Sequence, residues 1–156
     1  GLKDHKYAEV FRKQLYRLKG LKGKNIDFNV KINTYQAMYN LLKSKILQGC
    51  NRHKLAYTVL NNMAEEYKAA GMPNEYLMKK ILLYNIAFNV FGPNNKTSRY
   101  ILSEMQRLVY QEGWYDWCNY LKTKKSIDEP VNFIQCKVCS RIRPITIEEC
   151  NCSKEV

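Results

Sequence analysis

The sequence lacks any long apolar run and any apparent targeting segment. Its longest apolar region, 76–91, is interrupted by two lysines and two asparagines, so no stretch approaches the roughly 20 apolar residues of a membrane span. The first six residues are mostly polar and charged, which is not the pattern of a signal peptide. We therefore expect a chain without a membrane span that works inside the cell, in the cytoplasm or nucleus, and in the host cell if the protein is viral.

Motifs of catalysis are also missing. The chain has two histidines, His5 and His53, which lie far apart in the sequence. It contains no glycine-rich phosphate loop, no nucleophile elbow and no paired-acid motif, and acidic pairs such as Glu65-Glu66 are typical of a solvated surface. We therefore expect no enzymatic activity.

Acidic residues are scarce relative to basic ones. Fourteen Asp and Glu stand against 26 Lys and Arg, which gives a formal charge of +12. Such an excess favours a polyanionic partner, first of all nucleic acid (DNA or RNA), and then an anionic membrane or an acidic protein. A merely basic soluble protein would show the same excess, as would a subunit of a larger assembly such as a polymerase or a virion. Lys outnumbers Arg nineteen to seven and fifteen residues are Asn, a bias typical of A/T-rich coding sequences such as those of large viruses.

What the sequence does have is the composition of a folded domain, with 46% hydrophobic and 26% charged residues over 156 positions. Apolar residues at helical spacing predict six helices, at about 4–19, 34–49, 51–71, 73–92, 98–113 and 114–124. The fold class is therefore mainly α: a bundle of about six helices with a small C-terminal four-cysteine zinc knuckle or ribbon. The helix at 73–92 is apolar nearly all round, so we expect it at the centre of the bundle.

The remaining local features concern helix starts and one short strand. Residues 25–33 alternate between apolar and polar side chains, a pattern that suits a single strand. We expect Thr34 and Asn51 to cap the two helices that follow, and the fifth helix to begin after Thr97-Ser98. A charge-dense stretch ending at Pro130 breaks the helical pattern. We place a helical bundle domain at 1–125, a linker at 126–132 and a metal-binding module at 133–156.

Four cysteines in the tail have the spacing of a metal site. Cys136 and Cys139 are two residues apart, and Cys150 and Cys152 form a second close pair ten residues later. Such pairs can turn their sulfurs toward one ion, as thiolates about 2.3 Å from zinc. The segment 133–152 resembles the zinc-ribbon and zinc-knuckle class, although its second pair is Cys-x-Cys instead of Cys-x-x-Cys. We predict one structural Zn²⁺ held by all four sulfurs, with a small β-hairpin between the two pairs.

The need for an ion follows from the size of the segment. About twenty residues bury too little apolar surface to fold alone, so metal binding must supply the stability. Two disulfides or four free thiols are the alternatives, and disulfides would fit a secreted protein. An iron–sulfur cluster also uses four thiolates, but the spacing here is not that of a ferredoxin.

Basic residues gather in the N-terminal segment, where eight between positions 3 and 24 stand against two acidic ones. In the first helix, cations at positions 6, 13 and 17 lie opposite an apolar face formed by positions 7, 11, 15 and 18. A glycine-rich basic run follows, and we expect two arginines to protrude from the loop between the cysteine pairs. Either set of cations can be solvated only, but the charge imbalance favours phosphate contacts. The predicted nucleic-acid-binding residues are Lys6, Lys13, Arg17, Lys19, Lys22, Lys24, Arg141 and Arg143.

Two further patterns allow weaker hypotheses. The turn at Gly49 resembles that of a helix-turn-helix, with residues 51–54 opening the recognition helix, although Lys45 stands where a small residue is expected. An aromatic cluster follows later in the chain, and its spacing favours core packing, or a lid on the zinc module, over stacking on unpaired bases. Its members are Tyr110, Trp114, Tyr115, Trp117 and Tyr120.

Two functions fit the sequence. The first is a nucleic-acid-binding accessory factor for transcription, replication or packaging, in which the basic N-terminal segment contacts phosphate and the zinc module is a second contact. The alternative is a protein–protein adaptor or structural subunit, for example of a virus, that docks an acidic partner through its basic surface and zinc knuckle.

Overall fold

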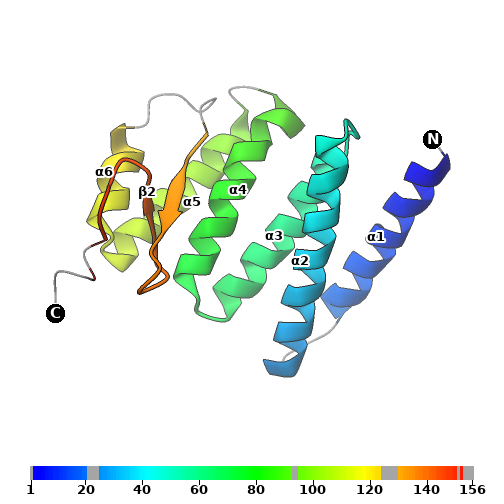
Figure 1. Ribbon diagram of the computed structural model, residues 1–156, viewed down its shortest axis with the longest axis horizontal. Helices are drawn as coiled ribbons and strands as arrows, with labels where there is room; N and C mark the ends of the chain where they lie inside the picture. The colour runs from blue at the N-terminus through cyan, green and yellow to red at the C-terminus, as the bar shows by residue number, and fades with distance from the viewer. Residues whose placement is uncertain (1, 21–24, 93–94, 124–129, 151, 153–156) are drawn as a thin grey trace.

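The structure is a computed structural model that describes residues 2–20, 25–92, 95–123, 130–150 and 152. Within these ranges the chain forms six helices and then two short strands. They are α1 (Leu2–Gly20), α2 (Asn25–Leu47), α3 (His53–Ala69), α4 (Pro73–Phe91), α5 (Lys96–Glu112), α6 (Tyr115–Thr123), β1 (Phe133–Gln135) and β2 (Ile142–Pro144). The helices follow one another across the molecule from α1 at one edge to α6 and the strands at the other (Figure 1). The predicted mainly α bundle with a small C-terminal β element is confirmed.

Helix α4 lies in the middle of this arrangement, between α3 and α5 (Figure 1). Its fully buried side chains are Leu77, Ile81, Leu83, Tyr84 and Ala87. This burial is why the sequence of α4 is apolar nearly all round, and the predicted central position is confirmed. None of the described helices combines the length and the apolar content that crossing a bilayer requires.

Three of the described lysines are buried in the bundle interior. Lys31 lies 3.2 Å from Glu66, and Lys80 lies 2.6 Å from Glu104, each pair joined by an ion pair. Lys79 is buried as well, and loss of solvent lowers its pKa below the usual value of a lysine. These three cations are neutralised or enclosed by the fold, so the sequence count overstates the positive charge on the surface.

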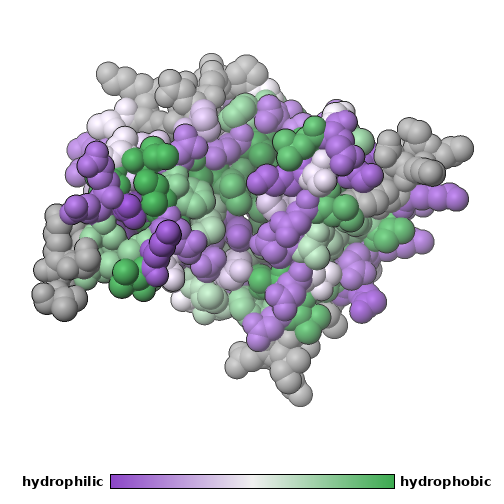
Figure 2. All heavy atoms as spheres, viewed as in Figure 1, coloured by the Kyte–Doolittle hydropathy of each residue, from purple (hydrophilic) through white to green (hydrophobic). Residues whose placement is uncertain are grey.

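Helix α1 has the two faces that its sequence predicts. Phe11, Leu15 and Leu18 are buried together with Ala8, while the cations at positions 6, 13 and 17 are exposed. The side chain of Tyr7, predicted for the apolar face, lies outside the described residues. On the face seen in Figure 2, hydrophilic side chains cover α1 and α2, interrupted by single apolar side chains.

The predicted strand at 25–33 is wrong, because these residues form the first half of α2. Side chains at 31, 35, 38 and 42 are buried, which is helical spacing, whereas Val30 is half exposed although the alternating pattern would have buried it. Thr34 is therefore not an N-cap. It lies inside the helix, where its hydroxyl donates to the carbonyl oxygen of Val30.

Two other helix starts differ from the prediction. Arg52, not Asn51, occupies the N-cap position of α3, and no side chain caps that helix. Helix α5 begins at Lys96 because Asn95 is its N-cap and accepts a hydrogen bond from the backbone N–H of Ser98 at 2.7 Å. Helix α5 ends as expected at Gly113, whose φ of 69° is the left-handed conformation that favours glycine.

The β-hairpin is present but encloses the first cysteine pair, so its predicted place between the two pairs is wrong. Strand β1 precedes Cys136 and pairs antiparallel with β2, with Phe133 opposite Pro144 and Gln135 opposite Ile142. The chain reverses at Ser140, which has a φ of 66°, so the strand after the turn meets the strand before it.

Candidate metal centre

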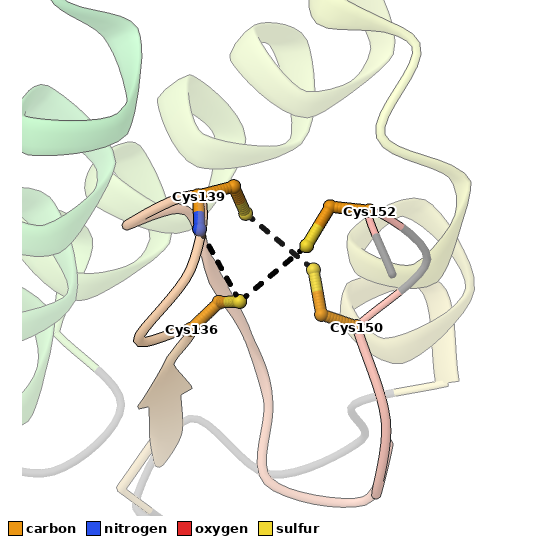
Figure 3. Close-up of side chains that lie close together, drawn as sticks. All are labelled: Cys136, Cys139, Cys150 and Cys152. Carbon is orange, nitrogen blue, oxygen red and sulfur yellow. Dashed lines mark hydrogen bonds between the residues drawn. The ribbon is translucent and has the colours of Figure 1, made fainter. Parts of the chain in front are cut away.

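The four tail cysteines converge on one point (Figure 3). Their sulfurs all lie within 4.8 Å of one another, and separations of 3.5 Å join Cys136 to Cys152 and Cys139 to Cys150. No disulfide bond joins any of these four cysteines. A tetrahedral ion about 2.3 Å from each sulfur needs sulfurs about 3.8 Å apart, so the cluster is compatible with one metal ion.

The turn after β1 favours the thiolate form of Cys136. The backbone N–H groups of Cys139 and Val138 donate to the Cys136 sulfur, which lowers the pKa of this thiol to about 6. The pKa of Cys152 is raised to about 12, because hydrogen bonds with the sulfurs of Cys150 and Cys136 favour its protonated form. Four negative thiolates at this spacing repel one another unless a cation stands between them. A divalent ion would displace the remaining protons and hold all four as thiolates.

Two asparagines of α4 hold the module against the bundle through its backbone. The Asn74 side chain donates to the carbonyl oxygen of Ser140 at 2.9 Å and accepts from the backbone N–H of Ile142 at 2.8 Å. Further along α4, Asn85 accepts from the N–H of Val131 at 2.7 Å and donates to its carbonyl oxygen at 2.9 Å. The incoming and returning segments of the module are therefore both fixed to the central helix.

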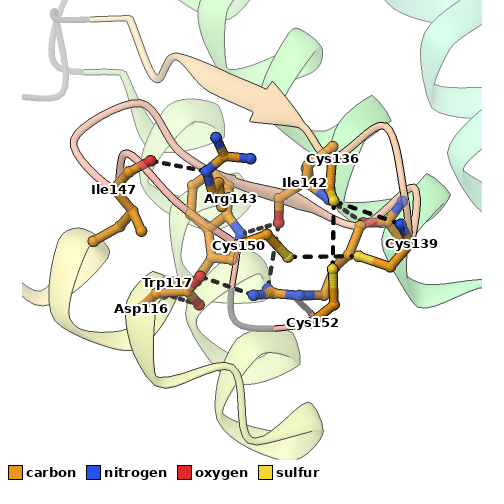
Figure 4. A network of polar contacts seen from close by, with 11 residues as sticks. Asp116, Trp117, Cys136, Cys139, Ile142, Arg143, Ile147, Cys150 and Cys152 are labelled. Atoms are coloured by element: carbon orange, nitrogen blue, oxygen red, sulfur yellow. Dashed lines mark hydrogen bonds and ion pairs between the residues drawn. The ribbon is translucent and has the colours of Figure 1, made fainter. Parts of the chain in front are cut away.

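Helix α6 supplies the other side of this contact (Figure 4). The indole N–H of the fully buried Trp117 donates to the carbonyl oxygen of Ile142 at 3.0 Å. Ile142 is itself fully buried and belongs to the same apolar core as the helices. The predicted division at 126–132 stays a prediction, since residues 124–129 lie outside the described chain. On either side of it, however, the two parts share one core.

Replacing Asn85 with Ala is expected to lower the free energy of unfolding by about 2 kcal/mol. The change leaves both backbone groups of the buried Val131 without their partners. Urea denaturation followed by circular dichroism measures the loss. Asn89→Ala is the matched control, because Asn89 is exposed on the same helix and controls for the higher helix propensity of alanine. Equal stability of the two variants would contradict this role of Asn85.

The two predicted arginines of the module are occupied within the molecule. The Arg141 guanidinium forms an ion pair with Asp116 at 3.0 Å and lies over the ring of Trp114. Arg143 donates to the carbonyl oxygens of Ile147 and Glu148, at 2.8 Å each. Both are half-buried, so the expectation that they protrude into solvent is wrong. Their contact with nucleic acid stays a prediction.

The predicted cations of the N-terminal segment fall into two groups. Lys6, Lys13 and Arg17 are exposed on α1. The side chains of Lys19, Lys22 and Lys24 lie outside the described residues. The structure does not bring the α1 cations together with the metal centre, because α1 and the C-terminal strands lie at opposite edges of the bundle (Figure 1).

The aromatic cluster is divided by the fold. Trp117 is fully buried and packs edge-on against Tyr120, and it also contacts the metal-binding module as the lid interpretation expected. Tyr110 and Tyr115 are about four-fifths exposed. The five side chains therefore form no single stacking surface.

Sequence reasoning missed Asn74, Asn85 and Asp116, which position the module. Their partners lie 66, 46 and 25 residues away in the chain, respectively. An asparagine inside a helix has no spacing pattern that distinguishes it from a solvated one, so only the fold identifies these residues.

Comparison of the chain with protein-family models, with curated proteins and with solved structures finds no match.

Proposed function

We propose that this chain is a nucleic-acid-binding accessory factor without catalytic activity, stabilised by one structural zinc ion. Its helical bundle contacts the phosphate backbone, and the zinc-held module completes the fold at the opposite edge. The accessory role in transcription, replication or packaging requires affinity for a polyanion and no reaction chemistry.

The observation that carries the proposal is the cationic face of α1. Lys6, Lys13 and Arg17 are exposed and share one side of this helix, opposite its buried side chains. Glu9 is the one acidic residue of α1 among its described side chains. Several exposed cations on one face of a helix can contact more than one phosphate, and each phosphate contact adds a salt-dependent contribution to affinity.

Zinc is the ion that fits the cysteine cluster best. A tetrahedral set of four thiolates is typical of zinc or of an iron–sulfur centre, and the spacing of these cysteines is not that of a ferredoxin. With four protein ligands the coordination sphere is full, so no position is left for an activated water. The ion would therefore hold the module together and take no part in a reaction.

The test is a titration of labelled DNA and RNA oligonucleotides, single-stranded and duplex, at several salt concentrations. The double variant Lys13→Glu/Arg17→Glu is expected to bind about tenfold more weakly at low salt. The slope of the logarithm of its binding constant against the logarithm of salt concentration should be smaller in magnitude by about two. Fluorescence anisotropy with the full chain measures both quantities.

The matched control moves the same charge change to another surface. Arg99 and Lys122 are exposed on α5 and α6, so Arg99→Glu/Lys122→Glu has the same net charge as the first variant. If both double variants lose affinity equally, the effect belongs to net charge and not to the face of α1. If no oligonucleotide binds at low salt, the proposal of nucleic-acid binding is wrong.

One observation favours the adaptor function as a second candidate. Val138 is 81% exposed at the tip of the metal-binding turn, and Ile145 is 50% exposed after β2. The arginines of the same module are engaged by other partners within the chain. An exposed apolar tip with occupied cations suits a protein contact better than a phosphate contact, and the absence of oligonucleotide binding would leave this candidate.

A further inference from the structure

A cavity of about 260 Å³ lies where three helices meet at one end of the bundle. One wall is α1, the second is the turn before α3 with the first residues of that helix, and the third is the end of α4. The start of α3 and the end of α4 lie side by side at this end (Figure 1). The polar side chains that line it are Arg12, Asn51, Arg52, His53, Lys54 and Asn89.

The charge of this cavity is of one sign. Two arginines, a lysine and a histidine line it, and none of the residues that line it is acidic. Within the described part of the chain, Arg12, Arg52 and Lys54 form no ion pair, in contrast to the paired Lys31, Lys80 and Arg141. The fold thus brings Arg12 together with cations 40 or more positions later in the chain, without neutralising them.

Two details of α3 add to this positive potential. The first turn of α3 contains no acidic residue, and no side chain caps it. Backbone N–H groups of that turn therefore lack a side-chain acceptor at the wall of the cavity. His53 contacts the side-chain oxygen of Asn51 through Nδ1 at 3.3 Å, which leaves its Nε2 atom available to a ligand.

From these features we infer that the cavity binds a phosphate group. Its volume is below the roughly 300–1,000 Å³ of sites for whole drug-sized molecules, so a compact anion fits it better. Arginine forks and uncapped backbone N–H groups are the donors that phosphate oxygens prefer. The inference rests on the proposed function for the source of that phosphate, which is the backbone of a nucleic-acid strand. Arg12 and Arg52 would then add two phosphate contacts to those predicted for the exposed face of α1.

The inference does not require the helix-turn-helix hypothesis. In a helix-turn-helix, residues at the start of the second helix project outward to base edges. Here Arg52, His53 and Lys54 line a cavity that α1 closes on one side. Contacts at this place would position a strand through its phosphates and would not read its sequence.

The test is a titration of the ¹⁵N-labelled full chain with inorganic pyrophosphate, followed by the amide resonances of residues 53–55. We expect saturable shifts at these amides, at an ionic strength held constant with chloride. The variant Arg12→Gln/Arg52→Gln, which removes two charges with little change of size, should bind pyrophosphate at least about tenfold more weakly. Arg99→Gln/Lys122→Gln, on the exposed surfaces of α5 and α6, should change the affinity by less than about twofold.

Competition with an oligonucleotide separates this inference from the proposed function. Displacement of pyrophosphate by the oligonucleotide supports both. Saturable pyrophosphate binding without any oligonucleotide binding would refute the proposed function and leave a site for a free phosphate compound. Oligonucleotide binding that is unchanged in Arg12→Gln/Arg52→Gln, together with non-saturating shifts spread over the surface, would overturn the inference and leave the proposed function standing.

Discussion

The variant Cys136→Ser is expected to abolish zinc binding and to unfold the C-terminal module. In the intact chain we expect about one zinc ion per molecule after purification without added metal. Removal of one ligand opens the closed site, and the same change removes the sulfur that accepts the N–H groups of Val138 and Cys139. Metal analysis by inductively coupled plasma mass spectrometry measures the stoichiometry.

The stability effect should be large, because the free energy of structural zinc binding is on the order of 10 kcal/mol and belongs to folding. Even a loss of about 5 kcal/mol would lower the melting temperature by roughly 10–20 °C in a chain of this size. A strong chelator added to the unmodified protein should have the same effect.

Cys50→Ser is the control for this experiment, since Cys50 is a free thiol in the turn between α2 and α3, outside the cluster. It should keep both the zinc and the melting temperature. If the unmodified protein carries no metal and chelator does not change its melting temperature, the cysteine cluster is not a metal site.

Local patterns were sufficient to predict the cysteine cluster. The spacing of Cys136 and Cys139 brings two sulfurs to one side of a turn, and a second close pair needs only a short connection to reach them. The amphipathic face of α1 is local in the same sense, because its burial repeats every three to four residues. Such features depend on few contacts from elsewhere in the chain.

The error at 25–33 shows where local patterns fail. When apolar residues occupy every second position, a window of only nine residues fits the helical period as well as the strand period. The ion pair of Lys31 with Glu66, 35 residues away, places the Lys31 side chain between α2 and α3. Without knowledge of that partner, a lysine in this window counts as a solvent-facing residue.

The contacts that fix the C-terminal module could not be predicted from local patterns either, because their partners also lie far away in the chain. Asn74 lies in the first turn of α4 and Asn85 interrupts the apolar pattern of this helix, and asparagines at such positions are normally solvated. Their partners are backbone groups of the tail, which any sequence can supply. The fold therefore determines which asparagines are structural, and to these contacts the tail contributes only backbone groups.

Trp117 of α6 and Ile142 of the module are buried in the same core, which affects how the chain unfolds. Both side chains are inaccessible to solvent and belong to one apolar cluster, and the Trp117 indole N–H donates to the backbone carbonyl oxygen of Ile142 at 3.0 Å. The module therefore loses part of its core when α6 separates from it. We expect the bundle and the module to unfold in one transition when zinc is bound.

The variant Trp117→Ala is accordingly expected to lower the free energy of unfolding by about 3–5 kcal/mol. It removes the largest fully buried side chain, its edge-on contact with Tyr120 and the donor to Ile142. Trp117→Phe retains most of the ring packing and deletes the N–H donor, so its loss should be about 1–2 kcal/mol. Urea denaturation of the zinc-bound protein measures both values.

Zinc affinity is the measurement that decides whether Trp117 acts across the two parts of the chain. Because Trp117 contacts the strand that follows the first cysteine pair, Trp117→Ala should also release zinc to a competing chelator more readily than the unmodified protein does. Trp114→Ala is the matched control, since this indole is half-buried on the surface beside Arg141 and should cost less stability. If Trp117→Ala destabilises the helices and leaves zinc affinity unchanged, then the module folds independently of the bundle, as the division at 126–132 predicts. If stability and zinc affinity both fall, the chain is one folding unit in which α6 of the bundle supports the cysteine cluster.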